Sequence, residues 1–407
     1  MIHVIGIGAG GYADLSGAAR DLLASAPAIL GAPRQLGLLP EALPAERREW
    51  PRPMMPGLRA AVEALPEGSV VLASGDPMFH GVGATLAREF GPDRFRVLPQ
   101  SSSAALACAR LGWPSAEVPV ISLVSRPVAA IIPALEGGRR FLVLGRDAAT
   151  PAEVAALVRA LTPKGTEPAE ITVLSELGGP HERVGDVQGA TSKLNVIAVE
   201  PHQGLGRSLA PGLPDSAYEC DRGQLTKQDV RAWTVAALAP RPGELLWDVG
   251  GGSGSIAIEW LRVCPSARAI SFERNEVRRE MIRRNAERLG TPELQVLGGA
   301  PEAFPTSTEL TPATASMSHS RPNVVFIGGG LTAAGVVTDA MAALMPGGRM
   351  VANAVTVESE RKLWELREQF GGEVRRIQVS AEHAVGRFTT MQPALPVTQW
   401  RWIKEDS

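Results

Sequence analysis

A glycine-rich turn between an apolar strand and a helix is the feature of this chain that most restricts its fold. The expected strand Leu245–Val249 runs into residues 250–254, and the helical pattern Ser255–Val263 follows directly. Glycines let the backbone turn tightly and approach a ligand without an intervening Cβ atom. The first N–H groups of the helix are free to point at that ligand. This unit predicts an α/β domain that binds a small cofactor at the end of the strand.

Strand and helix patterns continue to alternate after this turn. Strands are expected at Leu245–Val249, 269–273, 294–297, Val324–Ile327 and Arg349–Ala354, with helical patterns at Ser255–Val263, 276–289, 333–344 and 358–370. Two further strands, 373–379 and 397–402, have no helix between them. Glu273 ends the second strand, 25 residues after Asp248, where a carboxylate can accept hydrogen bonds from ribose hydroxyls. The segment predicts a Rossmann-like sheet that ends in an antiparallel strand pair.

The loop and the acidic residue fit both a nicotinamide enzyme and an S-adenosylmethionine enzyme. Asp248 precedes the first glycine in a D-x-G-x-G-x-G spacing, whereas the dinucleotide fingerprint G-x-G-x-x-G has no such requirement. The terminal strand pair also differs from the dinucleotide-binding fold. With these features, the segment resembles the class I S-adenosylmethionine-dependent methyltransferases. The resemblance implies S-adenosylmethionine as the cofactor.

Further motifs narrow this resemblance. The runs 225–231, 298–302 and 326–330 occur with the glycine loop in an order similar to that of the decarboxylating precorrin methyltransferases of cobalamin biosynthesis, over about 180 residues. The resemblance implies cofactor contacts at Thr226, Gly250, Gly251, Gly252, Ser253, Gly254, Glu273 and Ala300. One departure is Gly299, where the family often has Asp. This difference bears on how the adenine end of the cofactor is held.

The first 200 residues carry a second set of motifs. Strands are expected at Ile2–Ile7, Val70–Ser74, Phe95–Leu98, 120–124, Phe141–Leu144, Glu170–Ser175 and 194–199, which predicts an α/β domain with a mainly parallel sheet. The glycine loop 6–11 and the runs 73–81, 99–103 and 175–182 resemble the class III tetrapyrrole methyltransferases. Those enzymes bind S-adenosylmethionine in a cleft between two α/β lobes. The resemblance implies cofactor contacts at Gly75, Asp76 and Ser102, and Ala9 departs from the family, which usually has Pro there.

Both halves therefore resemble enzymes of one pathway, although their folds differ. We expect a two-lobed tetrapyrrole methylase domain at 1–200, a linker at 201–224 and a Rossmann-like class I methyltransferase domain at 225–407. The pairing resembles the bifunctional decarboxylating precorrin methyltransferases. It implies two S-adenosylmethionine sites, one per domain, and a tetrapyrrole substrate. The implied reaction methylates precorrin-6B at C5 and C15 and decarboxylates the ring C acetate, giving precorrin-8.

A polycarboxylate substrate needs cations in its binding site, ideally guanidinium groups. Candidates are Lys227 and Arg231 ahead of the glycine loop, and Arg387 in the late segment. His80 and His383 are candidate proton carriers because they lie within or near the motifs, and Arg387 is a further catalytic candidate. A lone histidine is more often structural, so the catalytic groups stay unassigned.

Composition limits the other classes of function. The net charge is -2 and aromatic residues make up 5% of the chain, which argues against a nucleic-acid partner. The cysteines, Cys108, Cys220 and Cys264, lie far apart, and no metal-ligand spacing occurs. No uncharged apolar run is long enough to span a membrane, so we expect a cytoplasmic protein without a membrane partner. We also expect a homo-oligomer. The alternatives are a methyltransferase of RNA or another small molecule, a nicotinamide-dependent oxidoreductase, or a scaffold without activity in the first domain.

Overall fold

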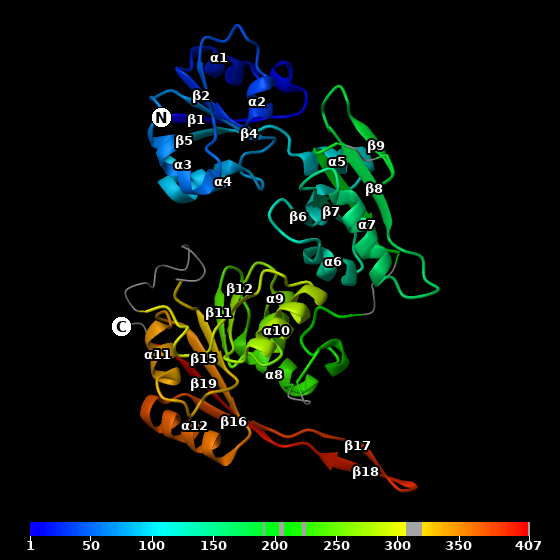
Figure 1. Cartoon of the computed structure of the whole chain (residues 1–407), viewed down its shortest axis with the longest axis vertical. Coiled ribbons are helices and arrows are strands. Elements are labelled where there is room, and N and C mark those ends of the chain that lie inside the picture. The colour runs from blue at the N-terminus through cyan, green and yellow to red at the C-terminus, as the bar shows by residue number, and fades with distance from the viewer. Residues whose placement is uncertain (190–191, 203–206, 222–224, 307–319, 406–407) are drawn as a thin grey trace. The chain divides into compact units, whose positions relative to one another are not determined.

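The chain divides into two compact units in a computed structural model, which describes residues 1–189, 192–202, 207–221, 225–306 and 320–405 (Figure 1). The first unit comprises Met1–Val128 and Gly138–Gln203. The second unit comprises Ala129–Gly137 and Gly204–Ser407. Within the described ranges, no helix combines the length and the apolar character that crossing a membrane requires.

The first sheet of the first unit is fully parallel. Its strands, in order across the sheet, are β3 (Glu46–Glu49), β2 (Ala28–Gly31), β4 (Val70–Ser74), β1 (Ile2–Ile7) and β5 (Phe95–Leu98). The helices of this lobe are α1 (Gly17–Ser25), α2 (Pro33–Gly37), α3 (Met54–Glu63) and α4 (Val82–Phe90). Separate apolar clusters form on its two faces, one around Ile5 and Leu72 and the other around Val4 and Val71. Burial on both faces is what a parallel sheet requires.

The second sheet of the first unit is mixed, which corrects the expectation of a mainly parallel arrangement. Its strands, in order, are β6 (Val120–Ser122), β7 (Phe141–Leu144), β10 (Asn195–Glu200), β8 (Glu170–Ser175) and β9 (Arg183–Gly185), and the helices of this region are α5 (Ser103–Leu111), α6 (Ile132–Glu136) and α7 (Thr150–Leu161). β6 is parallel to β7, but β10 is antiparallel to both β7 and β8. No described helix separates β9 from β10, and β10 enters between β7 and β8 in the opposite direction. α6 lies among the residues that group with the second unit.

The second unit contains one seven-stranded sheet. Its strands, in order, are β13 (Gln295–Leu297), β12 (Arg268–Phe272), β11 (Leu245–Val249), β14 (Val324–Ile327), β15 (Arg349–Ala354), β19 (Val397–Ile403) and β16 (Glu373–Ile377). The helices are α8 (Gln228–Leu238), α9 (Ser255–Val263), α10 (Glu276–Arg288), α11 (Val336–Ala343) and α12 (Val357–Phe370). β13 to β15 are parallel, and β19 runs antiparallel to both of its neighbours. The strand order reverses between β11 and β14, and such a point opens a crevice at the carboxyl ends of the strands.

Two further strands were not expected from the sequence. β17 (Ser380–Val385) and β18 (Phe388–Pro393) pair with each other as a separate two-stranded hairpin. Figure 1 shows this hairpin extending away from the sheet beside β16. Every residue of both strands is exposed. The short 3-10 helices are η1 (Gly11–Asp14), η2 (Pro92–Arg94), η3 (Ser115–Glu117), η4 (Val128–Ile131) and η5 (Asp215–Ala217).

Part of the stretch expected as a linker is packed into the second unit. Leu213 and Tyr218 flank η5 and are buried in the apolar cluster that contains Trp260. The Leu213 and Gly212 backbone N–H groups both donate to the Glu259 carboxylate on α9. These residues therefore belong structurally to the second unit.

Candidate functional site

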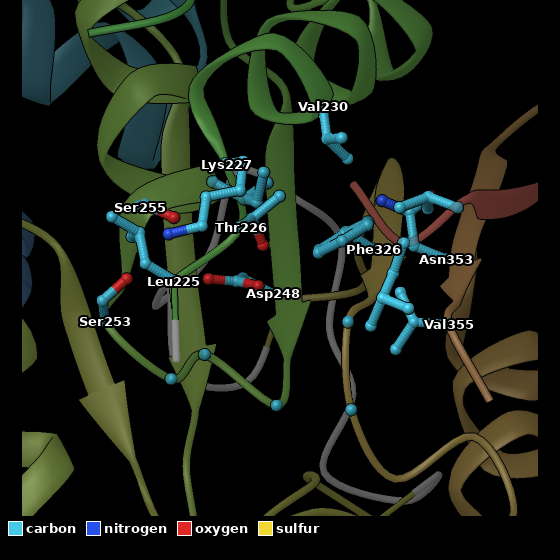
Figure 2. A pocket seen from close by; sticks show the side chains of 18 of the residues that line it. Leu225, Thr226, Lys227, Val230, Asp248, Ser253, Ser255, Phe326, Asn353 and Val355 are labelled. Atoms are coloured by element: carbon cyan, nitrogen blue, oxygen red, sulfur yellow. The ribbon is translucent and has the colours of Figure 1, made fainter. Parts of the chain in front are cut away.

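A large pocket opens at the carboxyl ends of the strands of the second unit, with a volume of about 1540 Å³ (Figure 2). It is lined by the start of α8, the glycine loop, the end of β12, the loops after β13 and β14, and the base of the hairpin. In Figure 2, Thr226 and Lys227 lie on one side of Asp248, and Asn353 and Val355 lie on the other. The volume is sufficient for a nucleoside cofactor together with part of a larger substrate.

The glycine loop is shaped by close packing as well as by the pocket. Gly250 has φ +77° and would place a Cβ atom 2.6 Å from the Gly329 nitrogen. A Cβ on Gly252, at φ +59°, would meet only the Gly250 oxygen at 3.9 Å, and Gly252 lines the pocket. Gly254 does not line the pocket; its Cβ would lie 2.7 Å from Ile282 on α10. Gly252 therefore leaves space for a ligand, whereas Gly254 permits helix packing.

Glu273 lies beneath this loop with its carboxylate held in a fixed orientation. Its Oε2 accepts a hydrogen bond of 2.9 Å from the Gly252 N–H, and its Oε1 accepts one of 2.9 Å from the Asn275 N–H. Each carboxylate oxygen can accept a second hydrogen bond. The carboxylate can therefore still receive two vicinal hydroxyls, which is the donor pattern of a ribose.

Asp248 is a buried carboxyl group in the wall of the same pocket. Burial, helped by the nearby Glu273 charge, raises the pKa of Asp248 to about 7, although hydrogen bonds from the Ser271 hydroxyl and the Ala257 backbone oppose the shift. An uncharged Asp248 avoids placing two carboxylates side by side in a desolvated site. A cationic ligand in this pocket would favour the ionised form instead.

Lys227 and Arg231 occupy different environments, although both precede the glycine loop. Lys227 is largely exposed, lines the pocket and lies 3.5 Å from the Asp215 carboxylate. Arg231 is fully buried and bonds to Glu259, Asp215 and the carbonyl oxygens of Thr226 and Leu213. All three guanidinium nitrogens of Arg231 are occupied by groups of the chain itself. The prediction that Arg231 contacts the substrate is therefore wrong. Arg231 instead holds Thr226 at the pocket edge.

The far end of the pocket is formed by Ala300, Gly299 and Arg274. A Cβ atom on Gly299 would lie 2.7 Å from the Arg274 Cβ and 3.1 Å from its Cα. The position expected to carry an acidic side chain therefore has no room for one while Arg274 keeps its place. No sequence motif singles out Arg274, and only the tertiary packing reveals its position in the pocket.

His383 and Arg387, the two candidate site residues near the end of the chain, lie on the same hairpin but in different surroundings. His383 on β17 lines the pocket together with Gln392 and Leu395. Arg387 lies in the turn between β17 and β18 and does not line the pocket; its guanidinium packs over the Phe388 ring. The turn lies at the end of the hairpin that is remote from the sheet. The prediction that Arg387 acts in this pocket is therefore wrong.

The first unit has its own, smaller pocket, with a volume of about 230 Å³. Gly75, Asp76, Ser102 and His80, which were named from the sequence, all line it. Asp76 Oδ1 accepts a 2.8 Å hydrogen bond from the Met78 N–H, which fixes the Gly-Asp-Pro turn. Ser102 caps α5 by accepting from the Ala105 N–H at 3.1 Å.

Several residues of this pocket were missed by sequence reasoning. They are charged or polar and come from α2, from the loop after β8 and from around the start of β10: Arg34, Glu176, Lys193 and Asn195. Glu176 falls inside the run 175–182 that carried the family resemblance, which is the signal that could have found it. Among the described residues of the chain, no group of three or more His, Cys, Asp or Glu side chains could hold a metal ion.

Comparison with known proteins gives a consistent picture for both halves. Residues 1–191 match the family described as Tetrapyrrole (Corrin/Porphyrin) Methylases, and residues 216–404 match the Precorrin methyltransferase domain. A Mycobacterium tuberculosis protein (strain CDC 1551 / Oshkosh) named precorrin-6Y C(5,15)-methyltransferase (decarboxylating) is 44% identical over 417 residues, covering 99% of this chain and 100% of its own length. A Sinorhizobium protein of the same name is 41% identical over 412 residues, covering 99% of this chain and 96% of its own.

A shorter relative matches less than half of the chain. It comes from Pyrobaculum calidifontis and is named probable cobalt-precorrin-6B C(15)-methyltransferase (decarboxylating). It is 32% identical over 193 residues, which cover 46% of this chain and 93% of the relative. The aligned length is comparable to the matched residues 216–404.

Proposed function

Because the chain belongs to the family of precorrin-6Y C(5,15)-methyltransferases (decarboxylating), we propose that it methylates precorrin-6B at C5 and C15 and decarboxylates the ring C acetate, giving precorrin-8. The observation that carries this proposal is the 44% identity to a relative of that name over 99% of this chain and 100% of the relative. The same match favours this function over an RNA methyltransferase or a nicotinamide-dependent oxidoreductase.

S-adenosylmethionine is the methyl donor, and we propose one site for it in each unit. In the second unit, Glu273 would hold the ribose, Gly252 would leave room for the methionine part, and Thr226 would border the pocket opposite Asn353. In the first unit, the turn at Gly75 and Asp76 would face Ser102 across the smaller pocket. When bound, the cofactor supplies an electrophilic methyl group, and the chain's contribution is to align it with a nucleophilic meso carbon.

The substrate carries many carboxylate arms, so the sites must offer cations that are not fully paired internally. Lys227 and Arg274 line the pocket of the second unit, and Arg34 and Lys193 line that of the first. The conjugated macrocycle can accept the electrons released by decarboxylation, so this step requires no additional electron sink from the chain. His383 remains a candidate for proton transfer in the second unit because it lines the same pocket.

We further propose that the first unit methylates C5 and that the second methylates C15 and decarboxylates. The Pyrobaculum calidifontis relative supports this division because its name joins C(15) methylation with decarboxylation, and it covers only 46% of this chain. The proposed boundaries are a first domain at 1–200 and a second at 225–407, with 207–221 packed onto the second. A homo-oligomer, a cytoplasmic location and the absence of a nucleic-acid partner stay predictions.

Two variants test the division of labour, with products followed by mass spectrometry after incubation with precorrin-6B and S-adenosylmethionine. Asp76→Ala should disturb only the first site, so the protein should still release carbon dioxide and add one methyl group. Gly252→Arg should block the second site, because a long side chain would enter the space that the glycine leaves open. Its product should keep the carboxylate. Normal decarboxylation by correctly folded Gly252→Arg protein would remove that chemistry from the second unit.

A further inference from the structure

The pocket of the first unit contains two residues with unusual backbone conformations. His80 has φ 55° and Glu176 has φ 52°, and both line this pocket. The left-handed region costs a residue with a Cβ atom roughly 1–2 kcal/mol. Strained residues of this kind concentrate at functional sites, where the surrounding structure holds them in place. The two positions are therefore candidates for a functional role.

Glu176 is held by hydrogen bonds on both its backbone and its side chain. Its N–H donates to the Leu194 carbonyl at 3.0 Å, and its own carbonyl accepts from the Gly179 N–H at 2.9 Å. The Ser192 hydroxyl donates to Oε1 at 2.5 Å. Oε2 has no hydrogen-bond partner within the part of the chain that the structure describes. One carboxylate oxygen is thus fixed, and the other is available to the pocket.

The turn that follows Glu176 packs directly against the first glycine loop. A Cβ atom on Gly179 would lie 2.8 Å from the Ala9 Cβ, and a Cβ on Gly10 would lie 2.7 Å from the Gly178 oxygen. The Glu182 carboxylate braces this turn by accepting from the Gly178 N–H at 2.7 Å and by pairing with Arg110 on α5. These contacts place Glu176 beside the loops at Gly8 and Gly75, which line the same pocket.

The other titratable groups of the pocket are less suited to accept a proton from a bound substrate. Arg34 and Lys193 are cations. Asp76, like Glu176, has one carboxylate oxygen engaged, by the Met78 N–H, and it lies in the turn proposed above to hold the cofactor. Arg34 is close enough to Glu176 for the two charges to interact, and this attraction opposes the desolvation that lowers the Arg34 pKa. His80 is exposed and packs edge-on against Phe79 with ring centroids 4.9 Å apart. His80 is therefore the alternative that an experiment must separate from Glu176.

We propose that Glu176 is the catalytic base that removes the C5 proton in the reaction of the first unit, and this inference rests on the proposed function of that unit. The π electrons of the meso carbon form the new bond to the methyl group while the sulfur–methyl bond breaks. C5 then carries both a methyl group and a hydrogen, and the positive charge lies on the conjugated ring nitrogens. The Glu176 carboxylate takes the hydrogen as a proton, and the electron pair of the C–H bond restores the double bond.

The test uses the full chain with precorrin-6B, unlabelled or deuterated at C5. Glu176→Gln should lower the rate of C5 product formation by roughly 10²-fold or more, because general base catalysis typically contributes that much. C15 methylation and carbon dioxide release should stay normal. A kinetic isotope effect at C5 should appear or increase, and a species absorbing at shorter wavelength should accumulate, since a tetrahedral C5 interrupts the conjugation. Glu176→Asp should recover part of the rate.

Matched variants separate this role from a structural one. Glu170→Gln, at the exposed start of β8, the strand that ends one residue before Glu176, should behave as the unmodified protein. S-adenosylmethionine affinity, measured by calorimetry, should change less than about twofold in Glu176→Gln; a parallel loss of affinity and C5 methylation without an isotope effect would assign Glu176 to folding of the site. An isotope effect in His80→Gln but not in Glu176→Gln would transfer the role to His80.

The outcomes also separate this inference from the proposed function. If Asp76→Ala abolishes C5 methylation and Glu176→Gln leaves it unchanged, Glu176 is not the base and the assignment of C5 to the first unit stands. If Asp76→Ala protein retains full C5 methylation while its cofactor binding in the first unit is lost, the assignment itself fails, and the inference about Glu176 fails with it.

Discussion

At the residue scale, the neighbouring carboxyl groups Asp248 and Glu273 give the second pocket a pH-dependent character. Folding raises the pKa of Asp248 from 3.8 to about 7. At a pH between these two values, the folded chain therefore holds a proton that the unfolded chain has lost. Stability from this group is complete below pH 4 and falls as pH rises toward 7, by at most about 4 kcal/mol. Asp248→Asn should flatten this dependence in thermal unfolding between pH 5 and 8. A slope equal to that of the unmodified chain would mean that Asp248 is ionised when folded.

Glu273 should contribute directly to cofactor affinity in the second unit. Glu273→Ala removes the acceptors proposed for the ribose and leaves the Gly252 N–H without its 2.9 Å partner. We expect affinity for S-adenosylmethionine in the second unit to fall by about 1–3 kcal/mol, or roughly 5- to 150-fold. The apparent KM of the decarboxylating reaction for S-adenosylmethionine measures this change. An unchanged KM would exclude Glu273 from the ribose contact.

The residues that could be predicted from the sequence are those whose role follows from local spacing. The glycine loop, apart from Gly254, and Glu273 line one pocket, as the strand–turn–helix pattern indicates. Arg231 was misjudged because its burial depends on contacts with Glu259 and with η5, which lie apart in sequence. Arg387 was misjudged because the hairpin that carries it was not recognised. Local residue spacing indicates neither the burial of Arg231 nor the hairpin that carries Arg387.

At the element scale, a buried ionic network holds α8 and η5 against α9. Arg231 and Glu259 are both almost fully buried, and Glu259 also accepts from the Tyr218 hydroxyl at 3.0 Å. Arg231→Met would leave the Glu259 charge buried without its partner, which typically costs about 3–5 kcal/mol. For a unit of this size, we expect the unfolding midpoint to fall by roughly 6–20 °C. Differential scanning calorimetry measures this shift.

A matched variant on the surface gives the control for this network. Arg284 on α10 forms an exposed ion pair with Glu219, and Arg284→Met removes it. Exposed pairs contribute about 0–1 kcal/mol to stability. Its midpoint should therefore stay within a few degrees of the unmodified chain. Equal shifts in both variants would show that the buried network adds no more than a surface pair.

The elements themselves were predictable where hydrophobic pattern and length agree. β1, β4, β11 and β14 have the expected bounds because each is a buried apolar run. β3 reads Glu-Arg-Arg-Glu and lies at a sheet edge, so no apolar pattern marks it. The hairpin β17–β18 has few buried contacts of its own, and its sequence shows no clear alternation. Its existence depends on backbone pairing rather than on a core.

At the scale of the whole molecule, the same hairpin is the feature that best supports a homo-oligomer. An isolated two-stranded hairpin is marginally stable in water. This one exposes 54% of Val385, 66% of Phe388 and 62% of Met391, which are large apolar side chains at a position where a partner surface would bury them. His383 on β17 lines the pocket of the second unit, so association through the hairpin would also fix one wall of that site.

We therefore predict that the chain self-associates through β17 and β18, and that charge on this surface disrupts the assembly. Phe388→Glu should convert the oligomer to monomer in sedimentation velocity, because burying an unpaired carboxylate is strongly unfavourable. Trp364→Glu places the same charge on α12, where the tryptophan is 46% exposed, and should leave the assembly intact. A chain that sediments as a monomer before substitution, or a Phe388→Glu protein that remains oligomeric, would contradict the prediction. Loss of C15 methylation in the Phe388→Glu monomer, with C5 methylation retained, would show that the hairpin wall must be fixed for the second site to work.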